Sequence, residues 1–315
     1  MLTVIWGGPL IRILRRLEVG DSIRLEAPER HMTKVGTPTM GGVMFILPVI
    51  LVTLLLNAVS LIGLSGEGRS ILVPLVALLS FAVLGGVDDW QKLKNSEIGE
   101  GLRARTKFII QIILAAVLAY ALRDFLHVPQ LLIPGFAFEI NLGVWYFPVA
   151  IFVIVGAANA INFTDGLDGL AGLIAATAFA TLGGIALFQG QSFLAQFCFT
   201  LVGALFGFLW FNVYPAELIM GDTGSLALGA VMGVVALMTG HWILLPLIAV
   251  IPVSEILSVI LQVAFFRITG GRRIFKMSPI HLHFELSGWS ENQIVLRFWL
   301  ISLLFAMVGI ALAVV

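Results

Sequence analysis

Charged residues are scarce in this chain. Asp, Glu, Lys and Arg make up only 11% of the 315 residues, whereas soluble domains carry about 25%. A soluble globule of this length could not cover its surface with so few charges, and a hydrophobic fraction of 59% excludes a disordered or fibrous chain. Lys+Arg and Asp+Glu each number 18, so the formal net charge is zero and nucleic acid is not an expected partner.

Cysteine and several common enzyme motifs are also lacking. Cys198 is the only cysteine, which excludes an internal disulfide and a zinc site built on several thiolates. The absence of GxxxxGK[ST] disfavours a P-loop nucleotidase, and the absence of HExxH leaves zinc without support. No internal repeat is visible. We therefore expect residues 1–315 to form a single transmembrane domain.

Continuous apolar runs are abundant. They are about 20 residues long, the length of a membrane-spanning helix, whereas the strands of a membrane barrel would alternate apolar and polar residues. The sequence thus predicts an all-α polytopic integral membrane protein with about ten transmembrane helices. One partial span covers residues 1–17. The nine full spans are 40–63, 69–87, 107–123, 143–161, 169–188, 192–213, 223–240, 242–266 and 294–315.

The basic residues predict the orientation of these spans. Sixteen of the 18 Lys and Arg fall on one side, and only Arg69 and Arg123 fall on the other. The sixteen lie in the loops 12–40, 88–107 and 267–297. The positive-inside rule makes those loops cytoplasmic and places both termini outside. Fourteen of the 18 acids share that side, and Glu255 alone lies within a span, which indicates a cytoplasmic-face site for a charged substrate and a metal ion.

The first acidic motif is GGVDDWQKLK at 85–94. We expect its helix to end at Asp88 and Asp89, where the negative end of the helix dipole disfavours carboxylates. Retaining both there favours a metal-associated or basic carboxylate pair. The alternative is a solvated helix end neutralised by Lys92 and Lys94.

The second motif is NAINFTDGLDGLAG at 159–172. Its polar residues Asn159, Asn162, Asp165 and Asp168 are each three apart, so neighbours in the series would share a face if the segment were helical. Asp168 alone could instead be the N-cap of the next helix.

The third motif is FNVYPAELIMGDTGSLALG at 211–229. Its GDTGS segment opens a helix whose exposed amides would suit phosphate. Asp222 offers the oxygen ligands that Mg²⁺ prefers. The alternative is an ordinary helix start capped by Asp222.

Two basic motifs complete the set. GGRRIFKMSPIHLHFELSGW at 270–289 combines cations with His281 and His283, which favours phosphate binding over simple positive-inside anchoring. We expect a β-like turn that places these two histidines on one side and Leu282 on the other. HMTKVGTPTMGG at 31–42 predicts a stiff turn into a helix, beside Lys34. All five motifs fall on the predicted cytoplasmic side, and together they suit phosphoryl transfer between a soluble pyrophosphate and a lipid phosphate.

In this combination and order the motifs resemble the phospho-N-acetylmuramoyl-pentapeptide transferase family of bacterial cell-wall enzymes, from about Arg12 to the C-terminus. The resemblance implies ten helices, a homodimer in the bacterial inner membrane and a cytoplasmic active site. It also implies Mg²⁺-dependent transfer of phospho-MurNAc-pentapeptide from UDP-MurNAc-pentapeptide to undecaprenyl phosphate, giving lipid I and UMP.

The resemblance further implies roles for individual residues. Asp88 and Asp89 match the family's aspartate pair, of which one deprotonates the lipid phosphate or acts as nucleophile. Asp222 matches the Mg²⁺ ligand, and His281 a catalytic position. The implied substrate-binding residues are Lys34, Thr39, Lys92, Arg105, Asn159, Asn162, Asp165, Asp168, Asn212, Ser225, Gln262 and His283.

Two departures from the family pattern stand out. Leu282 replaces the middle of three consecutive histidines, and we expect that missing histidine to be dispensable here. The loop after VDDWQK is also about one residue longer than usual.

Two other functions fit parts of the pattern. A sibling enzyme that transfers a simpler N-acetylhexosamine phosphate from UDP to a polyprenyl phosphate would share the aspartate motifs. A secondary transporter would carry its polar residues deep in broken helices, where only Glu255 is found.

Overall fold

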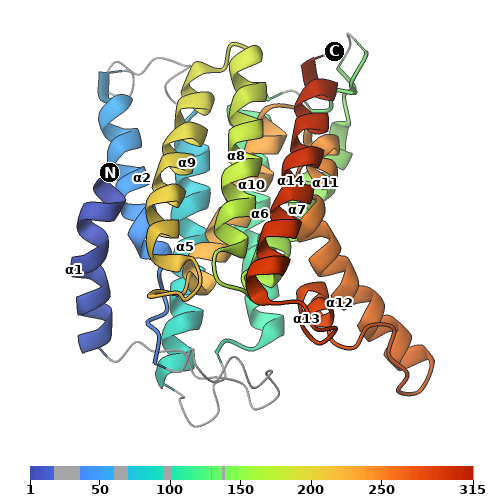
Figure 1. Cartoon of the computed structure of the whole chain (residues 1–315). Helices are drawn as coiled ribbons and strands as arrows, with labels where there is room; N and C mark the ends of the chain where they lie inside the picture. The colour runs from blue at the N-terminus through green and yellow to red at the C-terminus, as the bar shows by residue number, and fades with distance from the viewer. Residues whose placement is uncertain (18–35, 60–69, 95–100, 129, 137–138, 315) are drawn as a thin grey trace.

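The computed structural model is a bundle of helices (Figure 1). It describes residues 1–17, 36–59, 70–94, 101–128, 130–136 and 139–314. Within these ranges no strand forms, and an isolated β-bridge joins Leu132 to Glu139. The predicted all-α class is therefore confirmed. The helices are α1 (Leu2–Arg16), α2 (Gly42–Leu56), α5 (Leu72–Lys94), α6 (Ala104–Tyr120), α7 (Tyr146–Thr164), α8 (Leu170–Phe188), α9 (Ser192–Asn212), α10 (Gly221–Met238), α11 (Leu245–Ile248), α12 (Val250–Ile268), α13 (Ile280–Glu285) and α14 (Glu291–Val314).

Eight of the described helical segments are long and apolar enough to cross a membrane. These are α5, α6 with its π-helical end η2 (Ala121–Phe125), α7 with the preceding 3-10 turn η3 (Gly143–Trp145), α8, α9, α10, α12 and α14. A helix satisfies its own backbone hydrogen bonds, so apolar runs of this length are stable in lipid as helices. The predicted class of polytopic membrane protein is confirmed.

Helix α10 is the central element of the bundle. Every residue from Thr223 to Met238 is buried, and α10 packs most extensively against α5 and α7. The approach to α5 is so close that a Cβ atom on Gly85 would lie 2.0 Å from the carbonyl oxygen of Asp222. Glycine at position 85 is therefore what lets the N-terminal end of α10 reach α5.

The predicted span 242–266 is not one helix. A 3-10 turn, η4 (Trp242–Leu244), and the single turn α11 come first, and α12 begins only after Ala249. Pro252 accounts for the break, because it has no N–H to donate to the carbonyl four residues earlier and its ring crowds that carbonyl. Beyond the break, α12 leans away from the other helices (Figure 1).

The expected end of α5 at Asp88 and Asp89 is also wrong, because the helix continues to Lys94. Lys92 lies 2.8 Å from Asp88 and 3.6 Å from Asp89, at i+4 and i+3 spacing. These ion pairs offset the repulsion between the two carboxylates and the negative end of the helix dipole. Lysines in the last turn also stabilise that end of the helix.

In Figure 1 the marked C-terminus lies at the top of the bundle, and the marked N-terminus lies at the start of α1, about halfway up. The placement of both termini outside stays a prediction. Which end faces the cytoplasm remains a prediction from the distribution of basic residues.

Candidate active site

Three carboxylates from two helices meet at the lower end of the bundle. Asp88 and Asp89 project from α5 and are 2% and 3% exposed, and Asp222 projects from the first turn of α10. Each can place one carboxylate oxygen within 4.8 Å of the others, an arrangement that could hold a metal ion. The sequence predicts all three as site residues, and the structure brings them together.

Two lysines bridge two of these carboxylates. Nζ of Lys92 lies 2.8 Å from Oδ2 of Asp88 and 2.9 Å from Oδ2 of Asp222. Nζ of Lys107 lies 3.3 Å from Oδ2 of Asp88 and also bonds Oδ2 of Asp222. Two ammonium groups against three carboxylates, of which Asp88 and Asp89 are buried and Asp222 is partly buried, leave the cluster one negative charge in excess. An added cation or the acidic proton of a substrate would balance that excess.

Lys107 takes the position expected of Arg105, which is exposed on the first turn of α6. Residues two apart on a helix point about 200° away from each other, so only one of the two can face Asp222. The sequence alone did not fix the register of α6, so it did not show which of the two cations faces Asp222. One feature of the sequence could have indicated Lys107: it directly precedes the apolar run of α6.

Asp89 holds the start of α10. Its carboxylate accepts hydrogen bonds from the backbone N–H of Asp222 at 3.1 Å and of Thr223 at 2.9 Å, and from the Thr223 hydroxyl at 2.7 Å. It thus caps α10 from a neighbouring helix. The expectation that these amides are exposed to bind phosphate is wrong, because Asp89 takes two of them. The expected capping alternative for Asp222 is also wrong, since Asp222 lies inside the first turn.

Asn162 supports Asp222 from α7. Its amide donates to Oδ1 of Asp222 at 2.8 Å and to the Ser225 hydroxyl oxygen at 2.9 Å. Ser225 in turn donates to the carbonyl of Gly221. Asn159, one turn away, donates instead to Oε1 of Gln111 at 2.7 Å, so it is turned toward α6 and not toward the carboxylates.

The predicted polar face ends at Asp165. Helix α7 stops at Thr164, and Asp165 is its C-cap residue. Asp168 does not cap α8, whose N-cap is Gly169 with a positive φ of 81°. The Asp168 carboxylate accepts the N–H of Ala216 at 3.0 Å, which ties the turn before α8 to the segment between α9 and α10.

Asn212 braces the same segment. Its side-chain oxygen accepts the N–H of Gly169 at 3.0 Å, and its amide donates to the carbonyl of Leu218 at 2.8 Å. Asp168 and Asn212 are thereby engaged in shaping the loop that leads to Asp222.

Thr39 lies close to this cluster. The segment before α2 runs beside the segment before α10, with Ile219 N–H donating to the Pro38 carbonyl and Gly41 N–H donating to the Ile219 carbonyl, both at 2.8 Å. A Cβ on Gly221 would lie 2.9 Å from the Thr39 hydroxyl oxygen. Lys34, predicted from the same motif, lies outside the described residues.

The histidine motif forms a short helix, α13, and not the β-like turn that we expected. Helical geometry points residues 281 and 283 in nearly opposite directions. Nδ1 of His283 accepts the N–H of Lys276 at 3.1 Å, whereas Nδ1 of His281 lies 3.1 Å from Oε2 of Glu255. The side-chain oxygen of Gln262 accepts hydrogen bonds from the N–H groups of Ile274 and Phe275, each at 3.0 Å, and so holds the loop before α13 in place. Our expectation that the enzyme does not need a histidine at position 282 stays a prediction.

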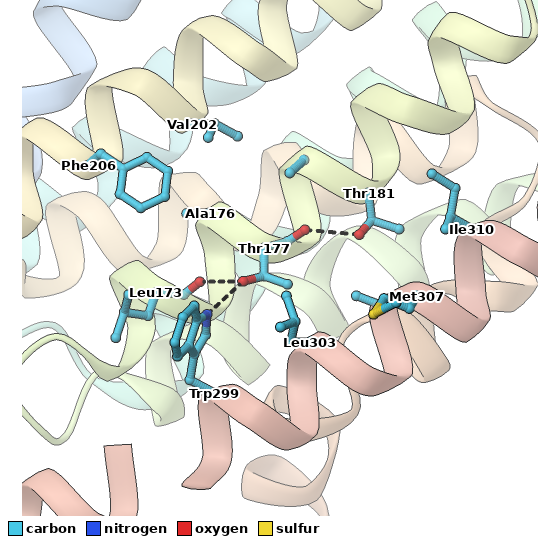
Figure 2. A pocket seen from close by; sticks show the side chains of 12 residues that line it. Leu173, Ala176, Thr177, Thr181, Val202, Phe206, Trp299, Leu303, Met307 and Ile310 are labelled. Carbon is cyan, nitrogen blue, oxygen red and sulfur yellow. Dashed lines mark hydrogen bonds between the residues drawn. The ribbon is translucent and has the colours of Figure 1, made fainter. Parts of the chain in front are cut away.

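An apolar cavity of about 350 Å³ lies between α8, α9 and α14 (Figure 2). Leu173, Phe206 and Leu303 contribute to its walls, and the Trp299 indole N–H donates to the Thr177 hydroxyl oxygen at 3.0 Å. No charged residue lines it. The cavity therefore cannot be the place where phosphate chemistry occurs.

Fold and cluster together define a class: a helical membrane protein that holds buried carboxylates and lysines at one end of its bundle. Comparison with known proteins narrows this class. Residues 71–240 match the profile of Glycosyl transferase family 4, and residues 34–46 match the phospho-N-acetylmuramoyl-pentapeptide-transferase signature 1.

Three relatives carry that second name in full. The phospho-N-acetylmuramoyl-pentapeptide-transferases of Chloroflexus aurantiacus, Geobacillus kaustophilus and Rickettsia prowazekii are 45%, 46% and 41% identical to this chain. The matches cover 100%, 100% and 98% of this chain and 87%, 95% and 89% of the relatives. The chain therefore belongs to the phospho-N-acetylmuramoyl-pentapeptide transferase family. It is a membrane-embedded phospho-sugar transferase, which removes the secondary-transporter alternative.

Proposed function

We propose that this enzyme transfers phospho-MurNAc-pentapeptide from UDP-MurNAc-pentapeptide to undecaprenyl phosphate, giving lipid I and UMP in peptidoglycan synthesis. The observation that carries the proposal is the cluster of Asp88, Asp222, Lys92 and Lys107 at one end of an apolar bundle. A lipid phosphate can reach that end from the bilayer, and a soluble nucleotide can reach it from water. Family membership favours this reaction over the sibling that uses UDP-N-acetylhexosamine.

The proposed reaction requires a carboxylate close to the lipid phosphate. An oxygen of undecaprenyl phosphate bonds to the sugar-bearing phosphorus, and the bond from that phosphorus to the bridging oxygen breaks to release UMP. In a one-step reaction Asp88 removes a proton from the lipid phosphate. In a two-step reaction the Asp88 carboxylate attacks first and the lipid phosphate then displaces it. We assign this role to Asp88, because both Asp89 oxygens bond the start of α10.

We infer that Mg²⁺ is the cofactor and that Asp222 holds it. Carboxylate oxygens are the ligands that Mg²⁺ prefers, and those of the cluster lie close enough to share an ion. When bound, Mg²⁺ neutralises charge on the diphosphate. The chain's own groups do the rest: Lys92 and Lys107 bind phosphate oxygens, and Asn162 fixes the orientation of Asp222 through Oδ1.

We also propose the setting of the reaction. The distribution of basic residues supports a cytoplasmic active site in the bacterial inner membrane with both termini outside. The resemblance supports a homodimer.

Release of UMP by the purified protein in detergent tests the function. We expect release only when UDP-MurNAc-pentapeptide, undecaprenyl phosphate and Mg²⁺ are all present. Turnover of UDP-GlcNAc in place of the muramoyl substrate would establish the sibling activity instead. A lack of UMP release with either donor, from protein that remains folded, would overturn the proposal.

A further inference from the structure

Glu255 is a carboxylate enclosed within a membrane-spanning helix. It lies in the second turn of α12 and its side chain is 0% exposed. Ionisable groups at such depth are expensive to bury and usually serve a function. Oε2 of Glu255 faces His281, 3.1 Å from Nδ1 of the ring and 3.4 Å from the backbone nitrogen. Its other oxygen, Oε1, has no hydrogen-bond partner among the described residues.

The opposite edge of the His281 ring faces Gly166. A Cβ atom at that glycine would lie 2.3 Å from Nε2 and 2.6 Å from Cε1 of the imidazole. The ring is 2% exposed and is confined between α12 and the turn that follows α7. Any side chain at position 166 would displace it, so glycine there is what admits the histidine.

This turn leads directly back to the carboxylate cluster. Gly166 follows Asn162 by four residues, and the Asn162 amide bonds Asp222. The end of α7 therefore contacts Asp222 through Asn162, and the turn that follows it contacts the His281 ring through Gly166. His281 is thus linked to the carboxylate cluster through the end of α7.

We propose that Glu255 is a positioning residue for His281, an inference that rests on the proposed function. Glu255 accepts the Nδ1–H bond, which fixes the neutral ring with its proton on Nδ1 and presents Nε2 to the substrate phosphates. Nε2 then accepts a proton or, once protonated, donates a hydrogen bond to a phosphate oxygen, and the buried carboxylate stabilises the imidazolium. A carboxylate behind a working histidine acts in this way in other enzymes.

Glu255→Gln tests the proposal, because glutamine keeps the shape and an acceptor oxygen but removes the charge. We expect kcat to fall by about tenfold to a hundredfold, the range seen when the group orienting a functional histidine is lost. The KM for UDP-MurNAc-pentapeptide should stay within about twofold, since Glu255 does not touch the nucleotide. Ser258→Ala is the matched control: it removes another buried polar group of α12, one that bonds the Glu255 carbonyl at 2.7 Å, and should leave kcat unchanged.

The His281→Ala background separates positioning from a structural role. There Glu255→Gln should lower kcat by less than about twofold, because its effect passes through the missing ring. An equal loss in both backgrounds, or a rise in KM with kcat unchanged, would overturn the proposal. If His281→Ala itself leaves turnover unchanged, the histidine's role in the proposed function fails, and that outcome is distinct from a failure of Glu255 alone.

A spectroscopic measurement keeps the proposal testable if Glu255→Gln does not fold. The ¹⁵N spectrum of histidine-labelled wild-type protein in lipid, assigned by comparison with His281→Ala, reports which ring nitrogen carries the proton. We expect Nδ1 of His281 to be protonated at alkaline pH. A ring protonated only at Nε2 would contradict the hydrogen bond to Glu255 and overturn the proposal.

Discussion

At the scale of single residues, the two neighbouring aspartates of α5 have different surroundings. The sequence offers no stability reason to keep both, but the structure supplies one for Asp89, which caps α10 through Asp222 and Thr223. Asp88 instead bonds Lys92, Lys107 and the N–H of Leu102 at 2.8 Å. Asp89 therefore holds the start of α10, and we propose that Asp88 is the member of the pair that acts in the chemistry.

We expect Asp88→Asn to abolish UMP release while the protein still folds and binds UDP-MurNAc-pentapeptide. Asp89→Asn should in addition lower the stability of the folded state by about 1–2 kcal/mol, the usual cost of losing a helix N-cap. Thermal unfolding in detergent and nucleotide binding distinguish the two variants. If Asp88→Asn unfolds at the lower temperature and Asp89→Asn does not, this division of roles is wrong.

Asp222 is the residue that we expect to respond to the metal. Asp222→Asn keeps an oxygen for Asn162 but loses the charge that faces the two lysines. Activity should fall by about a hundredfold or more, as for the loss of a group that stabilises transferring phosphate. The rate should also rise less steeply in a Mg²⁺ titration. An unchanged titration curve would remove Asp222 from the metal site.

Lys107 is the site residue that the sequence analysis missed. Lys107→Met removes one of the two cations that face Asp88 and Asp222, and we expect kcat/KM to fall by at least about tenfold through weaker phosphate binding. Arg103→Met removes an exposed cation from the start of α6 and serves as the control. Equal effects of both variants would mean that only the general positive charge of this loop matters.

At the scale of helices, the contact between α5 and α10 sets the geometry of the cluster. Gly85→Ala would place a methyl group 2.0 Å from the Asp222 carbonyl oxygen, whereas a methyl group at Gly86 would meet nothing closer than 3.6 Å. We expect Gly85→Ala to destabilise the protein by about 1–3 kcal/mol, as overpacking does, and to lower turnover. Gly86→Ala should do neither. Thermal unfolding and UMP release measured on both variants test this, and tolerance of alanine at position 85 would contradict the close contact.

Most helices could be predicted from the sequence, because long apolar runs have one stable form in lipid. Boundaries were less predictable. The extra turn of α5 depends on ion pairs formed by Lys92, and the break before α12 depends on where Pro252 falls. The length of an apolar run predicts neither the extra turn of α5 nor the break before α12.

The site was predictable where neighbours in the sequence are neighbours in space. The carboxylates and Asn162 came from local motifs. The pairing of Lys107 with Asp222, of Glu255 with His281 and of Asp168 with Ala216 joins residues from different helices or loops. Those contacts are set by how the helices pack, which no local pattern specifies.

At the scale of the whole molecule, orientation can be tested by labelling. Arg103 is the exposed residue before α6, and Ser192 is the exposed first residue of α9. Helices α6 and α9 begin at opposite ends of the bundle (Figure 1), and the native Cys198 is fully buried. A membrane-impermeant thiol reagent applied to intact cells should label Ser192→Cys and spare Arg103→Cys, and disruption of the cells should expose both. Ready labelling of Arg103→Cys in intact cells would reverse the proposed topology.

The enclosure of α10 also has a consequence for how the protein is made. Of the eight membrane-crossing segments it is the least apolar and the most buried, so it gains little from lipid and most from its neighbours. It follows α5 and α7 in the chain, and these are the helices that cover it. During biosynthesis α10 can therefore dock only after the earlier helices α5 and α7 are in place. Asp222 arrives with it, so the carboxylate cluster of Asp88, Asp89 and Asp222 forms only when α10 has docked.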